Sequence, residues 1–139
     1  MLVMTMEQMS AFLTEHFPQG EKFGVLSELG DNWAEMRLPV DAEHLRPGGT
    51  VSGPSMMALA DVCMYAALLG QIGPVALAVT TNLNINFMSK PQPDCDLIAR
   101  CNLMKVGKRL AVGEVWIRSE GSEEVVAHTT LTYSIPAER

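Results

Sequence analysis

The sequence has little cysteine, few aromatic residues and no excess of positive charge. Its three cysteines, Cys63, Cys95 and Cys101, form no C-x-x-C pair, which argues against a disulfide framework or a structural zinc site and fits a reducing compartment. The formal net charge of −6 argues against a general nucleic-acid-binding protein, because affinity for nucleic acids depends on cations that neutralise phosphates.

The sequence also lacks a long apolar run and a cationic N-terminal region followed by an apolar one. Its longest apolar run has about fourteen residues, short of the roughly 20 that a membrane-spanning helix needs. We therefore predict neither a signal peptide nor a membrane helix, and we expect a cytoplasmic protein. No repeat or compositional break divides the chain, so we expect a single domain over residues 1–139.

Hydrophobic periodicity predicts two helices and six strands. The second helix is apolar nearly all round, which requires burial on most sides. The last four strands are separated by short turns, which favour antiparallel pairing. We therefore expect an α+β fold in which an antiparallel sheet of about five to six strands wraps around one long helix. The predicted helices span residues 5–16 and 54–69, with Gly70 as the C-cap of the second, and the predicted strands span residues 23–29, 32–39, 75–88, 95–106, 109–119 and 123–135.

The strand predicted at residues 75–88 has two unlike faces. Strict alternation puts Thr80, Asn82 and Asn84 on a polar face and mostly apolar residues on the other. A polar face flanked by apolar residues suits a partly polar interface in which two sheets pair edge to edge. We therefore expect a homodimer or a homotetramer.

One acidic residue, Asp61, interrupts the apolar helix. Burying a carboxylate costs several kcal/mol unless it is paired or hydrogen-bonded. Asp61 therefore either bonds a neighbouring strand or a buried water in a purely structural role, or it takes part in chemistry. The helix start is itself a candidate site: Pro54 suits the first helical position, Ser52 or Gly53 is the cap, and unpaired amides there attract negative charge.

Other catalytic motifs are absent from the sequence. The serines near the helix start do not lie in G-x-S-x-G, and no glycine-rich stretch matches a nucleotide-binding motif. The histidines His16, His44 and His128 lack the spacing of metal-binding motifs, so we expect them at the surface or in loops.

A small basic cluster stands out in this acidic chain. Lys105, Lys108 and Arg109 crowd a turn around Gly107, and Lys90 lies in the same half of the sequence. Such a cluster either keeps a sheet edge soluble or binds the phosphates of a ligand.

The residues around the helix start resemble a motif of the hotdog-fold acyl-CoA thioesterases of the phenylacetate-pathway type. Those enzymes typically carry N-P-x-G-x-x-H-G-G, with an acid in a helix eight residues after the first glycine of H-G-G. This chain has R-P-G-G-T-V-S-G-P over residues 46–54, with Asp61 eight residues after Gly53. Arg46 replaces the usual asparagine, Ser52 the usual histidine, and Pro54 the second glycine.

Two later patterns extend the resemblance to roughly residues 20–135. A T-x-x-N-x-x-F-x-x-P-like pattern is echoed by Thr81, Asn84, Phe87 and the nearby Pro91, and a G-[RK]-[RK]-L turn matches residues 107–110. The resemblance implies a hotdog fold, dimers or tetramers with sites at the subunit interface, and no metal or cofactor, because CoA is part of the substrate.

The resemblance also implies roles for individual residues. Asp61 corresponds to the general base or nucleophile, and the Gly53 amide to the group that polarises the thioester carbonyl. Thr80 matches a residue that assists water, often from the partner subunit. Ser52 stands at the position of the motif histidine, and Arg46 brings a cation that would pair with Asp61 or with an anionic acyl group. The expected substrate-binding residues are Arg46, Asn82, Lys90, Lys105, Lys108 and Arg109.

We therefore expect a thioester hydrolase that cleaves a small or medium acyl-CoA to the free acid and CoA. The alternative is a protein of the same fold that binds acyl-CoA, or regulates, without catalysis. A hydratase or dehydratase would need a histidine close to the acid, and His44, the only nearby candidate, does not match the family's position. We expect no nucleic-acid or membrane partner.

Overall fold

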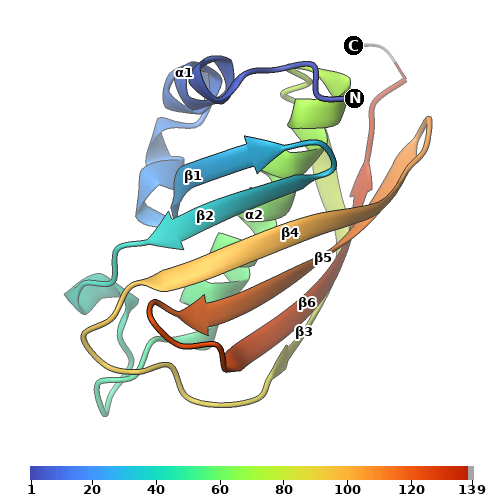
Figure 1. Ribbon diagram of the computed structural model, residues 1–139. Coiled ribbons are helices and arrows are strands. Elements are labelled where there is room, and N and C mark those ends of the chain that lie inside the picture. Colours follow the sequence, from blue (N-terminus) through green and yellow to red (C-terminus); the bar gives the residue numbers. More distant parts are fainter. Residues whose placement is uncertain (138–139) are drawn as a thin grey trace.

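The computed structural model of the chain describes residues 1–137, in which an antiparallel sheet curls around one long helix (Figure 1). This is the predicted α+β hotdog architecture. The helices are α1 (Met6–His16) and α2 (Gly53–Ile72), with short 3₁₀ turns η1 (Pro18–Lys22) and η2 (Ala42–His44). The strands are β1 (Val25–Gly30), β2 (Trp33–Leu38), β3 (Val79–Phe87), β4 (Leu97–Val106), β5 (Leu110–Ser119) and β6 (Val125–Ser134).

The six strands form one sheet in the order β1-β2-β4-β5-β6-β3, and every neighbouring pair is antiparallel. The antiparallel pairing confirms the prediction. However, β3 does not lie beside β4, which follows it in the sequence. It pairs with β6 at the far edge of the sheet, and residues 88–96 carry the chain across to β4. The sheet therefore has β1 at one edge and β3 at the other.

Small residues on the inner face of the sheet let α2 lie against it. Ala34 on β2 and Ala99 on β4 are fully buried, and the Cys63 thiol of α2 contacts both of their carbonyl oxygens at 3.6 Å. A Cβ atom at Gly113 on β5 would lie 2.5 Å from the sulfur of Met64. The interior is close-packed at these contacts, so larger side chains would push the helix away.

Helix α2 is longer than predicted. It starts at Gly53 and ends at Ile72, with Gly73 at a φ of 95° as its C-cap. Gly70 is instead a buried packing position, where an added Cβ would lie 3.1 Å from Leu2 and 3.2 Å from Leu29. By length and composition alone, α2 is long and apolar enough to span a membrane, whereas the apolar run in the sequence predicted a helix too short to do so. More than half of α2 is buried inside the fold, as in the core helix of a globular protein.

Strand β3 contains a β-bulge that strict alternation does not predict. Thr80 lies opposite Tyr133, and Asn82 lies opposite Thr132, so Thr81 is the extra residue. A bulge of one residue exchanges the two faces of the strand beyond it. Thr80 therefore faces α2 whereas Asn82 faces outward, and the prediction that they share one polar face is wrong.

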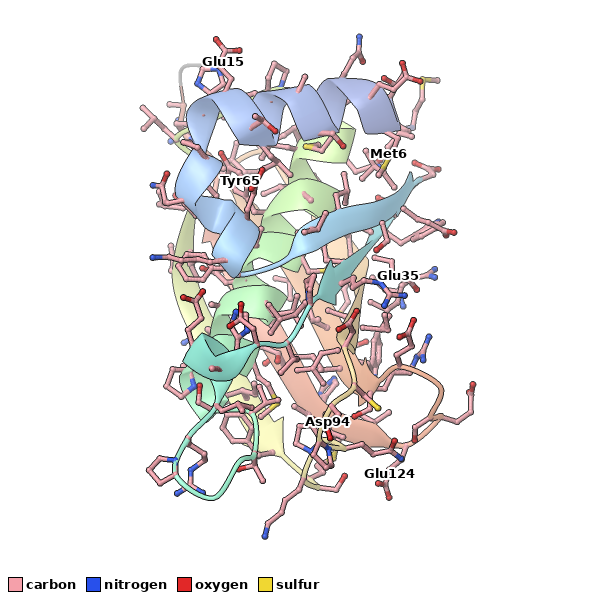
Figure 2. The ribbon with its side chains drawn as sticks, turned by 90° about the vertical axis from the view of Figure 1, so that its left-hand side faces the viewer. Met6, Glu15, Glu35, Tyr65, Asp94 and Glu124 are labelled. Atoms are coloured by element: carbon pink, nitrogen blue, oxygen red, sulfur yellow. The ribbon has the colours of Figure 1, made fainter. Side chains whose placement is uncertain are left out.

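The N-terminal segment crosses the upper end of α2 and lies beside β1, as Figures 1 and 2 show. Thr5 caps α1 and forms a capping box with Gln8. Met9 and Phe12 are the buried residues of α1, and both belong to the core. At Phe17 the chain turns into η1, which leads to β1.

Candidate active site

Asp61 lies in the middle of α2, and two hydroxyl groups bond the same oxygen of its carboxylate. Thr80 Oγ1 donates to Asp61 Oδ1 at 2.6 Å, and the Tyr133 hydroxyl lies 2.7 Å from the same atom and 3.0 Å from the Asp61 carbonyl oxygen. Within residues 1–137 the second carboxylate oxygen accepts no hydrogen bond. The carboxylate is thus held on one side and left with a free acceptor on the other.

The bulge in β3 and the pairing of β3 with β6 bring the two hydroxyls together. Thr80 and Tyr133 lie directly opposite each other, so their side chains point to the same face of the sheet. Only 3% of Tyr133 is exposed. Burial and the neighbouring Asp61 carboxylate raise the pKa of the Tyr133 hydroxyl far above its ordinary value, so this group remains a donor at physiological pH.

A cavity of about 520 Å³ lies beside this carboxylate. The chain has four Phe, two Trp and two Tyr, and four of these eight aromatic residues line the cavity. Its walls are therefore largely apolar, and their polar side chains are His16, Asp61, Thr80 and the two tyrosines. The lining residues are His16, Phe17, Phe23, Ala58, Asp61, Val62, Tyr65, Ala76, Ala78, Val79, Thr80 and Tyr133.

The start of α2 is capped by Ser52. Its hydroxyl accepts a hydrogen bond from the Ser55 amide at 3.2 Å and donates one to the Ser55 hydroxyl at 2.8 Å. Gly53 occupies the first helical position, where its N–H has no acceptor within the helix. An added Cβ at Gly53 would lie 3.1 Å from the ring of Phe87, so this amide lies near the far end of β3.

Gly53 and Asp61 of one chain do not face a common point. They are eight residues apart on α2, which corresponds to about 12 Å along the axis at about 1.5 Å per residue. A thioester carbonyl bonded to the Gly53 amide therefore lies too far from the Asp61 carboxylate of the same chain for attack.

Comparisons with known proteins agree with this architecture. A family model described as "Thioesterase superfamily" matches residues 48–126, more than half of the chain. The chain belongs to the thioesterase superfamily. Membership makes it a thioester hydrolase, and it confirms the resemblance that the sequence motifs indicate.

Solved structures of other proteins are similar over most of the chain. A protein from Silicibacter sp. that is assigned as a thioesterase has 50% sequence identity and a TM-score of 0.91, with 98% of this chain and 94% of that chain covered. The phenylacetic acid degradation protein PaaI from Thermus thermophilus, in a mutant form, has 28% identity and a TM-score of 0.75, with coverage of 86% and 99%.

Zebrafish thioesterase superfamily member 2 has only 17% identity, and its TM-score of 0.84 over 96% of this chain and 99% of that chain shows a shared fold. A comparison with curated protein sequences gives no match.

In this thioesterase, Arg46 and Asn82 lie away from the Asp61 carboxylate. Arg46 is exposed in the loop before α2, and within residues 1–137 it forms no ion pair with Asp61. Asn82 is exposed on the outer side of β3 because of the bulge. In a single chain the structure therefore groups neither residue with Asp61, Thr80 and the cavity.

The basic cluster divides into two parts. Lys105, Lys108 and Arg109 are exposed around the turn between β4 and β5. Leu110, next to that turn, pairs with Ser134, which pairs with the cavity residue Val79. Two strand spacings separate Leu110 from Val79, or about 10 Å. The turn is thus close to the cavity.

Lys90 follows the opposite end of β3 from the cavity residue Val79. The length of β3 is about 26 Å at about 3.3 Å per residue. In one chain Lys90 therefore lies far from the turn that carries Lys108 and Arg109, and its part in substrate binding stays a prediction.

The three histidines do not form one site. His16 lies at the end of α1 and lines the cavity, and His128 lies on β6 with its Nε2 3.1 Å from Glu114. His44 is buried in η2, not at the surface. Its Nδ1 accepts from the Asp41 amide at 3.0 Å, and its Nε2 lies 2.8 Å from the Lys22 carbonyl oxygen. Both ring nitrogens of His44 thus bond the backbone.

One group of side chains has the proximity that a metal ion needs. Ligand atoms of Asp41, Glu43 and His44 lie within 4.8 Å of one another. Because both nitrogens of His44 already bond the backbone, a metal ion at this position would have to displace one of these bonds.

Sequence reasoning missed Tyr133. The signal was present, because a tyrosine at an inward-facing position of a strand must find a partner for its hydroxyl group. In the structure that partner is Asp61. Which acceptor the Tyr133 hydroxyl meets depends on the pairing of β6 with β3, and the sequence did not predict that pairing.

Neither tyrosine should ionise in its ordinary range while the protein is folded. Burial raises the pKa of Tyr65 above the usual 10.0, and burial with the Asp61 charge raises that of Tyr133. Alkaline spectrophotometric titration should therefore show little tyrosinate at pH about 10, where the unfolded chain is about half ionised. Because folding raises the pKa values of both tyrosines, their neutral hydroxyls contribute stability. That stability is present below pH about 10 and is lost as the pH rises further. Half-ionised tyrosines in the folded protein at pH about 10 would contradict this assignment.

Proposed function

We propose that the chain hydrolyses a small or medium acyl-CoA to the free acid and CoA, with Asp61 as the catalytic carboxylate. The observation that supports this most is the hydrogen bonding of the Asp61 carboxylate and its position in the cavity wall. One of its oxygens is held by Thr80 and Tyr133, and the residue lines a largely apolar cavity. Its hydrogen-bond partners are neutral hydroxyls and not a cation, so no ion pair within residues 1–137 occupies the carboxylate.

Two routes use the free oxygen of Asp61. In the first, the carboxylate removes a proton from water, the hydroxide adds to the thioester carbonyl, and the tetrahedral intermediate expels the CoA thiolate. In the second, the carboxylate itself attacks the carbonyl, the tetrahedral intermediate expels the CoA thiolate, and water hydrolyses the resulting anhydride to the free acid and the Asp61 carboxylate. The Thr80 hydroxyl donates its proton to Asp61, so its oxygen lone pairs are available to position the water.

The oxyanion donor comes from a second subunit in this proposal. Strand β3 lies at an edge of the sheet, and two β3 edges related by a two-fold axis would run antiparallel. Gly53 contacts the Phe87 end of β3, and Asp61 bonds Thr80 at the other end. Edge pairing therefore brings Gly53 of the partner subunit toward Asp61, where its N–H stabilises the developing oxyanion.

Two further residues have roles in this proposal, Lys90 through the pairing of subunits and Ser52 through bonds within its own chain. The pairing carries Lys90 of the partner subunit toward the Val79 end of β3, and so toward the cavity and the basic turn. Ser52 holds the first turn of α2 through its bonds to Ser55 and thereby fixes the Gly53 amide. Ser52 is a positioning residue in this scheme, because its hydroxyl is already bonded.

The cavity and the basic turn together suit an acyl-CoA. The aromatic walls accept an apolar acyl group, and the volume lies within the range of small-molecule sites. Lys105, Lys108 and Arg109 lie close enough to bind the phosphates of the nucleotide end. The similarity to a phenylacetic acid degradation protein fits an aromatic-walled site. The three free cysteines fit the reducing cytoplasm.

Replacing Asp61 by Asn should lower the rate of CoA release by about 10²–10⁴-fold. Asn has the same shape, and its carbonyl oxygen still accepts from Thr80 and Tyr133, so the fold should remain. The measurement is thiol release across a panel of acyl-CoAs. Glu114→Gln is the matched control, because Glu114 is a half-buried carboxylate on the outer face of the sheet, bonded to His128.

Near-normal hydrolysis by Asp61→Asn would show that another group does the chemistry. A wild-type protein that binds acyl-CoA tightly but releases no thiol would replace the proposal by the alternative of a binding protein.

Replacing Lys108 and Arg109 together by Ala should raise KM with a smaller effect on kcat, because their contact with the nucleotide end is made equally in the ground and transition states. The control is the pair Arg100→Ala and Arg118→Ala, which removes the same charge from the outer face of the sheet. A KM that is unchanged at low salt for the first pair would argue against this docking site.

Light scattering at micromolar concentration should give a mass of two or four times the 15.2 kDa of one chain. The reason is that four apolar side chains on and beside the β3 edge are half-exposed or more in a single chain, a cost that pairing relieves. A mass near 15.2 kDa would contradict the interface. The four side chains and their exposed fractions are Leu77 (76%), Val79 (53%), Phe87 (50%) and Met88 (55%).

A further inference from the structure

A second, smaller cavity lies behind the wall of the first. It has a volume of about 90 Å³, against about 520 Å³ for the cavity beside Asp61. Two residues, Phe17 and Val62, line both cavities. They therefore form the partition between the two spaces, with Phe17 from the N-terminal segment and Val62 from α2.

The inner part of the small cavity is apolar. Leu26 and Met36 line it and are 8% and 1% exposed. Gly20 and Gly24 contribute backbone without side chains, so they leave room. Besides Phe17 and Val62, the rest of it is lined by two apolar and three polar residues, Leu13, Val25, Ser10, Thr14 and Glu21. An acyl chain that passed the partition would thus run over apolar walls toward the surface between α1 and β1.

Hydrogen bonds hold the main chain of Phe17, and neighbouring residues pack against its ring. Its N–H donates to the Leu13 carbonyl oxygen at 2.9 Å, and its own carbonyl oxygen accepts from the Gly20 amide at 2.9 Å. Its ring packs on Gly20, where an added Cβ would lie 2.6 Å from the ring. The ring of Phe23 lies 6.2 Å away, centroid to centroid. A side chain held on several sides makes a rigid end wall rather than a flexible flap.

We propose that Phe17 is a specificity-determining residue, whose ring closes the inner end of the acyl cavity and sets the longest acyl chain that the enzyme hydrolyses. This inference rests on the proposed hydrolysis of acyl-CoA. Phe17 lies outside residues 48–126, the region that matches the thioesterase family model. Chain-length selection would therefore be located in a different part of the sequence from the catalytic carboxylate.

The test is the chain-length profile of Phe17→Ala, measured as kcat/KM over a series of straight-chain acyl-CoAs. Removal of the ring joins the two cavities, so the ratio of kcat/KM for substrates longer than the wild-type optimum to that at the optimum should rise by about tenfold or more. Phe17→Leu should give a smaller shift in the same direction. Gly20→Ala, which displaces the ring without removing it, should also change the profile.

Phe12→Ala is the matched control, because Phe12 is a buried phenylalanine of α1 that lines neither cavity. It should lower stability and leave the chain-length profile unchanged. An unchanged profile in Phe17→Ala and Phe17→Leu, with both variants folded, would overturn the inference while the proposed hydrolysis stands. A profile that shifts equally in Phe12→Ala would also overturn it, because general loosening would then be the cause.

A second readout does not depend on hydrolysis. Dissociation constants for the same acyl-CoAs are measured by calorimetry in the Asp61→Asn background, with and without Phe17→Ala. The longer chains should gain affinity relative to the shorter ones only when the ring is absent. If the wild type hydrolyses no acyl-CoA but this shift occurs, the proposed function fails, while Phe17 still sets the longest acyl chain that the cavity binds. If affinities of all chain lengths change alike, the inference fails.

Discussion

The close approach of α2 to the sheet is the constraint on which the rest of the structure depends. The inner face carries alanine or glycine where the helix passes, as at Ala34, Ala99 and Gly113. This depth of burial excludes water from the helix and fixes its rotation. It also means that few hydrogen-bond donors can reach a carboxylate in the middle of α2. Asp61 is therefore positioned by packing that extends across the whole sheet.

The bonds to Asp61 explain how a carboxylate persists in this apolar setting. Two neutral hydroxyls, from Thr80 and Tyr133, replace part of its hydration without neutralising it. A cation such as Arg46 would have stabilised the charge more strongly, but it would also have made the carboxylate a weaker base. The arrangement satisfies one oxygen and leaves the other for a reactant. It is thus compatible with both stability and chemistry.

The sequence predicted the features that depend on local pattern. The apolar run predicted α2, the turns predicted the strands, and the lone acid in the run drew attention to Asp61. The features that depend on pairing between distant strands escaped prediction. Tyr133 meets Asp61 only because β6 lies beside β3, and Lys90 is separated from Arg109 because it follows the end of β3 that is remote from the β4–β5 turn. Gly70 looked like a helix end, since its role as a packing position depends on neighbours remote in sequence.

The bulge at Thr81 divides β3 into two segments, and the alternation of inward and outward side chains is reversed between them. Before it, Thr80 points to the carboxylate, and after it, Leu83 points to the core. Loss or gain of a single residue between these two positions would exchange the faces of one segment, so that either the core side chain or the hydroxyl turned outward. The fold therefore fixes the length of this short stretch.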